Sequence, residues 1–250
     1  MVAVLGFVAV VAVACGPSPQ SAPAPGVAPA DLLLDPSVLP IGFSTSELSV
    51  RDLVEANASQ LTTSESTVVT PERCRPTADA TLNPTLTEAN SAVLAAQSSS
   101  GGLVELVTTV QRDIGADVVA LTGVCARTET TIRDGNLAGA RIVTVHTPMP
   151  APDIGRNADK VEQMLLIASA TTTTLADQSV RSRIDYVGYA LVAHRSGGAP
   201  VTLALTVSGD PTAAVAPPAP APPAQPPISD QEFVTLFGSA VTTAVQGRSP

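Results

Sequence analysis

The chain has 250 residues, with 13 Lys and Arg against 22 Asp and Glu, and a formal net charge of −9 at pH 7. This acidic balance, without any basic run, argues against nucleic acid as a partner. Aromatic residues make up only 2% of the chain and Trp is absent, so we expect an aliphatic core without stacking platforms for bases or sugars.

The first segment is a short apolar run from Val2 to Ala14, followed at once by Cys15. As a helix it spans about 20 Å, whereas the hydrocarbon core of a bilayer is about 30 Å thick. The run therefore predicts a signal peptide over residues 1–14. Small residues before a cysteine are typical of a bacterial lipoprotein signal, in which the thiol carries a diacylglycerol, so we predict lipidation at Cys15. The alternative is an ordinary secretory signal in which Cys15 has no special role.

A segment rich in Pro, Ala, Ser and Gly follows Cys15. It has no apolar periodicity and cannot bury enough surface to offset the entropy of ordering. We therefore expect residues 15–30 to be a lipidated Pro-rich tether, which in polyproline geometry reaches up to about 45 Å. The folded domain is expected over residues 31–209.

The first half of that domain is predicted to mix strands with helices. Ser98–Gly102 consists of Ser and Gly, which favour a tight turn. Apolar side chains at helical spacing run from Ile114 to Cys125. The elements predicted here are a strand over 44–50, a short helix over 51–61, a hairpin over 89–97 and 102–111, and a helix over 113–125.

Cys74 lies between Pro71 and Pro76, which fix a turn, and Cys125 ends the predicted helix. If Cys15 carries lipid, these two cysteines form the remaining pair, and an exported chain meets conditions in which a disulfide closes. A loop of about 50 residues gives about 4 kcal/mol of stabilisation in the chain-entropy model. Two free thiols or a metal pair are the alternatives. No CxxC spacing or adjacent histidine favours a metal.

The second half of the domain is rich in β-branched residues. Ser196–Ala199 is a hairpin turn signal between the last two strands, so we expect the last three strands to form an antiparallel meander. The strands are predicted over 128–134, 140–146, 161–173, 184–194 and 200–208.

A Pro/Ala-rich linker is expected over residues 210–228, followed by a C-terminal amphipathic helix over 229–247. Ser229 and Glu232 have the spacing of a capping box at its start. We expect its apolar stripe to pack on one face of the sheet; a partner-binding or membrane-lying helix is the alternative, although the basic polar face of a membrane helix is absent. The stripe consists of Phe233, Leu236, Phe237, Ala240, Val241, Ala244 and Val245. The predicted fold class is α+β: a single domain with an antiparallel β-sheet packed against helices and one disulfide.

The lipoprotein signal, the Pro-rich tether, the two cysteines and the terminal helix that includes Phe233–Val241 together resemble a known family. They look like actinobacterial, chiefly mycobacterial, lipoproteins similar to the extracellular sensor domain of the receptor kinase PknH. The resemblance covers roughly residues 33–246 and implies an antiparallel sheet with packed helices, an envelope location and a role in sensing or ligand binding. The chain departs from the kinase sensor domain by having one candidate disulfide in place of two, by lacking a kinase domain, and by inserting the Pro/Ala segment before the last helix.

No catalytic motif is present in the sequence. His146 and His194 are the only histidines, and GxSxG, HExxH and SxxK are all missing. The closest acidic set, Asp153, Asp159 and Glu162, lies beside Arg156 and Lys160, so it predicts a solvated, neutralised loop and not a calcium site. We therefore predict no enzyme activity, no cofactor and no metal.

The sequence favours a ligand-binding or sensor module of the cell envelope, anchored to the extracytoplasmic face of the cell membrane through lipid. The expected ligand is a small apolar molecule or an envelope protein, held in a cleft between sheet and helices. One alternative is a non-catalytic interaction protein that recruits an envelope partner through its Pro-rich arm or C-terminal helix. A second alternative is an envelope hydrolase.

Overall fold

A computed structural model describes residues 27–65, 67–195, 198–216 and 223–247. The predicted signal peptide, Cys15 and the tether as far as residue 26 lie outside the described residues. The last four residues of the predicted tether are folded, because Val27 packs against the core and a 3₁₀-helix, η1 (Pro29–Leu32), begins at Pro29. Burial of Leu32, Leu33 and Leu34 directly after it holds this segment on the domain.

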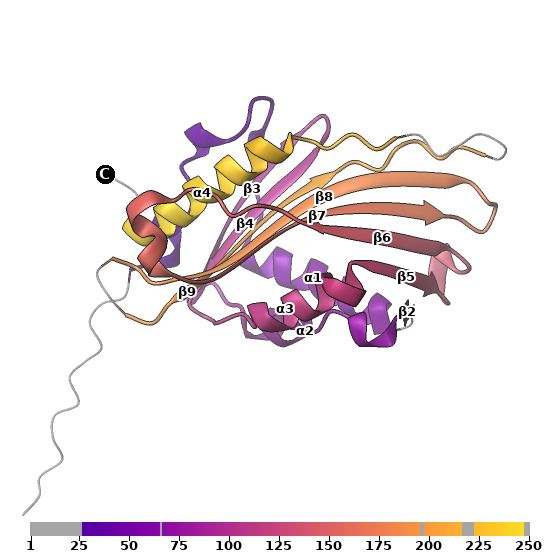
Figure 1. Cartoon of the computed structure of the whole chain (residues 1–250), viewed down its shortest axis with the longest axis horizontal. Helices are drawn as coiled ribbons and strands as arrows, with labels where there is room; N and C mark the ends of the chain where they lie inside the picture. The colour runs from indigo at the N-terminus through magenta and orange to yellow at the C-terminus, as the bar shows by residue number, and fades with distance from the viewer. Residues whose placement is uncertain (1–26, 66, 196–197, 217–222, 248–250) are drawn as a thin grey trace, which may run out of the picture.

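The described residues form one nine-stranded antiparallel sheet in the order β1-β3-β4-β9-β8-β7-β6-β5-β2 (Figure 1). This confirms the predicted fold class. Strands β7 to β9 form the expected meander, and β5 and β6 extend it, because each strand from β5 to β9 pairs with its neighbour in the chain. Strand β9 then pairs with β4. The strands are β1 (Ser44–Ser46), β2 (Thr67–Thr70), β3 (Ser91–Ser98), β4 (Gly101–Thr108), β5 (Arg127–Ile132), β6 (Arg141–Pro148), β7 (Val161–Thr174), β8 (Val180–Val192) and β9 (Val201–Gly209).

One face of the sheet is covered by the C-terminal helix α4 (Asp230–Gln246) (Figure 1). Ser229 and Glu232 form the predicted capping box, which satisfies backbone N–H groups at the start of the helix. The Phe233 ring stacks on Tyr186 of β8 with centroids 5.0 Å apart, and Phe237 lies over Gly188 of the same strand. The main apolar core of the protein therefore lies between α4, η1 and the sheet.

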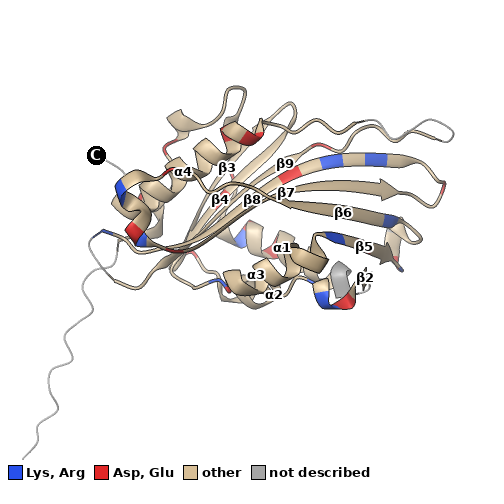
Figure 2. Cartoon of the chain, viewed as in Figure 1, with Lys and Arg blue, Asp and Glu red and all other residues tan. Residues whose placement is uncertain are grey.

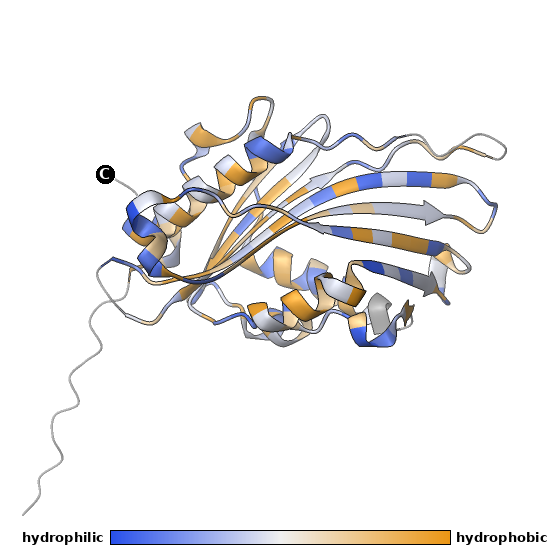
Figure 3. Ribbon diagram, viewed as in Figure 1, coloured by the Kyte–Doolittle hydropathy of each residue, from blue (hydrophilic) through white to orange (hydrophobic). Residues whose placement is uncertain are grey.

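Three helices lie on the opposite face: α1 (Val50–Glu65), α2 (Ala78–Leu82) and α3 (Ile114–Leu121) (Figure 1). Helices α1 and α2 share a small core with β3 and β4, whereas α3 shares one with β7 and β8. Figure 3 shows hydrophobic positions on these helices and on the strands between the two helical layers. None of the helices in the described ranges is long and apolar enough to cross a membrane.

Most predicted elements differ from the structure in their bounds by a few residues; the helix predicted over 51–61, for example, runs from Val50 to Glu65. Two of the differences have a clear local cause. The strand predicted over 44–50 ends at Ser46, because Ser49 exchanges hydrogen bonds with Asp52 and so starts α1 at Val50. The helix predicted over 113–125 ends at Leu121, because Thr122 is extended and Gly123 has a positive φ of 58°.

The break places Cys125 in a separate 3₁₀ turn, η5 (Gly123–Cys125). There it forms the predicted disulfide with Cys74 of η3 (Glu72–Cys74), with a Cα–Cα distance of 5.3 Å. The bond is fully buried and joins the segment before α2 to the segment after α3. It therefore ties together α2 and α3, two of the three helices on this face of the sheet.

Candidate functional site

A cleft of about 830 Å³ lies between α1, α2 and the sheet, on the face opposite α4. Its walls come from segments far apart in the chain: α1 and α2 on one side, and β2, β4, β5, β6, β8 and β9 on the other. The volume lies within the range of about 300–1,000 Å³ that is usual for small-molecule sites.

Aliphatic side chains make up much of the cleft lining. They come from both the helices and the strands, and they follow from the alternation that turns every second residue of a strand toward one face. Among them are Leu53, Leu61, Leu86, Val104, Leu106 and Ile132. Most of the surface of a bound apolar molecule would therefore contact aliphatic side chains.

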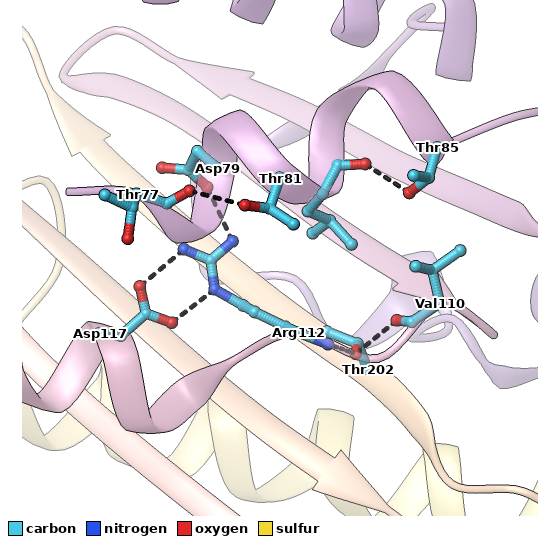
Figure 4. A network of polar contacts seen from close by, with 9 residues as sticks. Thr77, Asp79, Thr81, Thr85, Val110, Arg112, Asp117 and Thr202 are labelled. Carbon is cyan, nitrogen blue, oxygen red and sulfur yellow. Dashed lines mark hydrogen bonds and ion pairs between the residues drawn. The ribbon is translucent and has the colours of Figure 1, made fainter.

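One wall of the cleft holds the buried side chain of Arg112, which is 3% exposed (Figure 4). Its guanidinium donates two hydrogen bonds to Asp117, from Nε at 2.6 Å and from Nη2 at 2.8 Å, and a third to Asp79 at 2.7 Å. The guanidinium carbon also lies 3.9 Å from the centre of the Tyr189 ring. The Arg112 backbone N–H donates to Thr202 Oγ1, so backbone and side chain are both fixed.

These contacts keep the network charged. Burial by itself lowers the pKa of the Arg112 guanidinium, but the hydrogen bonds and charge of Asp117 and Asp79 outweigh it and raise the pKa, so the group stays protonated. Burial raises the pKa of Asp117, opposed by Arg112, and burial also raises that of the Tyr189 hydroxyl. Because its positive charge is already paired, Arg112 acts as a fixed part of the wall.

Asn83 is a second buried polar residue of the cleft, 5% exposed, at the start of the 3₁₀-helix η4 (Asn83–Thr85) that continues α2. Its Nδ2 donates to the Val54 carbonyl of α1 at 3.0 Å. Within the part of the chain that the structure describes, no donor lies within hydrogen-bond distance of Asn83 Oδ1. A buried acceptor of this kind is uncommon in a folded protein.

Away from the helices, four polar side chains form a row across four neighbouring strands. His146 of β6 lies opposite Ser169 of β7, Ser169 opposite Asp185 of β8, and Asp185 opposite Ser208 of β9. Residues directly opposite in antiparallel strands share a face, and Ser208 lines the cleft, so the row lies on the cleft face. His146 Nδ1 is 2.9 Å from Ser169 Oγ, and Asp185 is paired with Arg183 at 2.8 Å.

Burial lowers the pKa of His146, so the imidazole is neutral near pH 7 and fits the role of a base toward Ser169. The order of the row differs from a hydrolytic triad, because the serine stands between the histidine and the carboxylate. Strand β7 is also paired on both sides, with β6 and β8. Its backbone N–H groups are therefore engaged in the ladder and do not form an oxyanion hole at Ser169.

The other candidates from the sequence lie elsewhere. Asp159 pairs with Lys160 at 3.3 Å at the end of a 3₁₀-helix, η7 (Gly155–Lys160), and Asp153 accepts from the Gly155 N–H. His194 lies half-buried near the end of α4, where burial lowers its pKa. Across the described ranges, no three His, Cys, Asp or Glu side chains gather in a group that would hold a metal ion. Figure 2 shows the charged residues scattered over the fold.

Sequence reasoning identified Cys74 and Cys125 but neither Asn83 nor Arg112. The only local signal for Arg112 was a charged residue between two apolar segments, β4 and α3, whose packing leaves it little exposure. Asn83 precedes Pro84 and so looks like an ordinary turn residue.

Comparison with known proteins adds little. No family model and no curated protein matches the chain. Among solved structures, the crystal structure of an uncharacterized protein from Mycobacterium smegmatis, described as the Rv0999 ortholog, matches 84% of this chain and 92% of its own. The two sequences are 15% identical and the TM-score is 0.39, so we draw no conclusion from this match about fold or function.

Proposed function

We propose that the protein is a ligand-binding or sensor module of the cell envelope that holds a small apolar ligand in the cleft between α1, α2 and the sheet. The observation that carries this proposal is the cleft itself, with its volume of about 830 Å³ and its aliphatic lining. Sites of this size, mostly apolar and with few fixed polar groups, are the usual form of small-molecule sites.

The location forms part of the same proposal. The signal sequence and Cys15 support a lipid anchor on the extracytoplasmic face, and the resemblance to the PknH-like lipoproteins supports an envelope role. Metabolic labelling with a palmitate analogue tests the anchor. Label on the wild-type protein that is lost in Cys15→Ala is the expected result, and an unlabelled wild type would refute it.

Ligand binding is tested by the thermal stability of the full chain in the presence of envelope lipids, because a ligand that binds only the folded state raises its stability. Ala56 and Ala58 are both exposed residues of α1, but Ala56 lines the cleft and Ala58 lies outside the lining. We expect Ala56→Phe to reduce the lipid-induced shift and Ala58→Phe to leave it unchanged. Equal shifts in both variants would place the ligand outside the cleft.

The hydrogen bond between His146 and Ser169 favours a second candidate, an envelope hydrolase. The paired backbone of β7 argues against it. A fluorophosphonate probe distinguishes the two functions. Labelling that disappears in Ser169→Ala would support the hydrolase, and we expect no labelling.

The alternative function, a non-catalytic interaction protein that uses its C-terminal helix, has less support. Its C-terminal helix would need a free apolar face, but every member of the stripe of α4 is buried in the domain itself.

A further inference from the structure

A second pocket, of about 270 Å³, lies between η7, the chain that follows β8 and the last turn of α4. We call it the η7 pocket; it shares no lining residue with the cleft. Backbone hydrogen bonds fix its walls to one another, because the Ala193 N–H donates to the Lys160 carbonyl and the Arg195 N–H to the Val245 carbonyl, both at 2.8 Å. Figure 2 shows Lys and Arg residues beside this end of α4.

The η7 pocket is positively charged in a chain whose formal net charge is −9. Three cationic side chains line it, Arg156 and Lys160 of η7 and Arg195 after β8. Of the described residues in the lining, only Asp159 carries a carboxylate, and it pairs with Lys160 at 3.3 Å. Three positive charges and one negative charge leave a net charge of +2.

The two arginines of the pocket are not used within the protein. Among the described residues, neither Arg156 nor Arg195 forms an ion pair, and neither guanidinium donates a hydrogen bond. Cations near a helix C-terminus often bond its last carbonyls. In α4 backbone N–H groups do this, from Arg195 to Val245 and from Gly247 to Thr243. The guanidinium donors are therefore available to a bound molecule.

A buried amide lines the same pocket. Asn157 of η7 is 8% exposed, and its Oδ1 accepts from Nε2 of Gln246 at 3.3 Å. In the part of the chain that the structure describes, no acceptor bonds Asn157 Nδ2. This atom keeps accessible surface, unlike Oδ1 of Asn83 in the cleft, so a molecule in the η7 pocket can reach it. A ligand oxygen there would satisfy a donor that is otherwise costly to bury.

These groups fit a compact anion with several acceptor oxygens and about two negative charges. A phosphate monoester has three such oxygens and a charge of about −1.5 to −2 at pH 7. A carboxylate carries a single charge and would leave part of the +2 uncompensated. The volume lies just below the range of about 300–1,000 Å³ that is usual for small-molecule sites, so the pocket suits a phosphate with a short substituent.

We propose that the η7 pocket binds a phosphate monoester, as a soluble metabolite or as the head group of a lipid. Arg156, Lys160 and Arg195 hold the phosphate oxygens through charge-assisted hydrogen bonds. Nδ2 of Asn157 donates one more hydrogen bond from the pocket wall. This site is separate from the cleft, and the inference goes beyond the apolar ligand proposed there.

The test uses the purified full chain and two phosphate probes at about pH 7.5, where a phosphate monoester is mostly a dianion. Glycerol 3-phosphate is titrated by calorimetry, with acetate as the singly charged comparison. Cosedimentation compares phosphatidylcholine vesicles that contain phosphatidic acid, a phosphate monoester, with vesicles that contain phosphatidylglycerol, a diester. We expect at least one monoester probe to bind about tenfold more tightly than its comparison. Preference for glycerol 3-phosphate identifies a soluble ligand, and preference confined to phosphatidic acid identifies a lipid.

Variants then assign the binding to the η7 pocket. Arg156→Gln combined with Arg195→Gln should weaken it at least about tenfold, because two charged donors are lost. Arg133→Gln combined with Arg181→Gln removes the same charge from exposed positions outside the pocket and should leave binding unchanged. Asp159→Asn should tighten binding about threefold, a gain that misfolding does not produce.

Three results would overturn the proposal. They are binding of neither phosphate probe, acetate and phosphatidylglycerol binding as well as the monoesters, and equal losses in the two double-arginine variants. The last result would show an effect of net charge and not of a site. None of them affects the apolar-ligand proposal, which the thermal stability of the Ala56 and Ala58 variants tests separately.

Discussion

Replacing Arg112 with methionine is expected to destabilise the domain by about 3–5 kcal/mol, because it leaves a buried carboxylate without its partner. The side chains of Arg112 and Asp117 are 3% and 5% exposed, and two hydrogen bonds join them. Asp79 is 53% exposed, so water solvates its carboxylate in the variant. The loss of its ion pair with Arg112 therefore costs at most about 1 kcal/mol. Guanidinium chloride unfolding followed by circular dichroism measures the loss.

The pH dependence of this loss has a definite sign. Without Arg112, burial, together with the negative charges of Asp79 and Asp113, raises the pKa of Asp117 above the unfolded value, so the folded state takes up a proton first on acidification. The stability deficit of Arg112→Met should therefore shrink from pH 8 to pH 5. The double variant Arg112→Met with Asp117→Leu should regain most of the loss. A single variant within about 1 kcal/mol of the wild type, or a double variant no better than the single, would refute the reasoning.

Three further predictions concern residues outside the lining of the cleft. Removing the disulfide by substituting Cys74 and Cys125, which are 51 residues apart, should cost about 4 kcal/mol in unfolding experiments. Gly188→Ala should cost about 1–3 kcal/mol, because the added Cβ would lie 2.4 Å from ring atoms of Phe237. Burial holds the pKa of His146 below its unfolded value, so stability falls as pH drops through the range in which unfolded histidine titrates, about pH 6.5; His146→Gln should flatten that decrease in the thermal midpoint.

Each of the three has a control. Reducing agent should lower the stability of the wild type and leave the variant without Cys74 and Cys125 unchanged. Gly102→Ala places its Cβ no closer than 3.9 Å to a neighbour, so it should cost much less than Gly188→Ala; equal losses would contradict the steric argument. Since burial also lowers the pKa of His194, His194→Gln should remove a separate part of the acid sensitivity, and an unchanged pH profile in His146→Gln would show that His146 is not its source.

The elements that were predicted well depend on short-range signals. The capping box at Ser229 and the apolar stripe fixed the start and the buried face of α4 within a single segment. Turn residues before Gly101 located the β3–β4 hairpin in the same way. Where two local signals competed, the prediction was wrong: Ser49 continued a β-like pattern but caps α1, and Gly123 interrupts a helical spacing that otherwise reaches Cys125.

The sequence by itself determined the class of the fold, the cysteine pair and the packing helix, because caps, turns, periodicity and cysteine counts are properties of neighbouring residues. Only the tertiary structure decided where a ligand could bind. The cleft exists because β4 pairs with β9, about a hundred residues later in the chain. It also requires α1 to lie over these strands and over strands from the other half of the sheet. Asn83 and Arg112 become notable only there, since burial, and not residue type, makes one an unpaired acceptor and the other the centre of an ion-pair network.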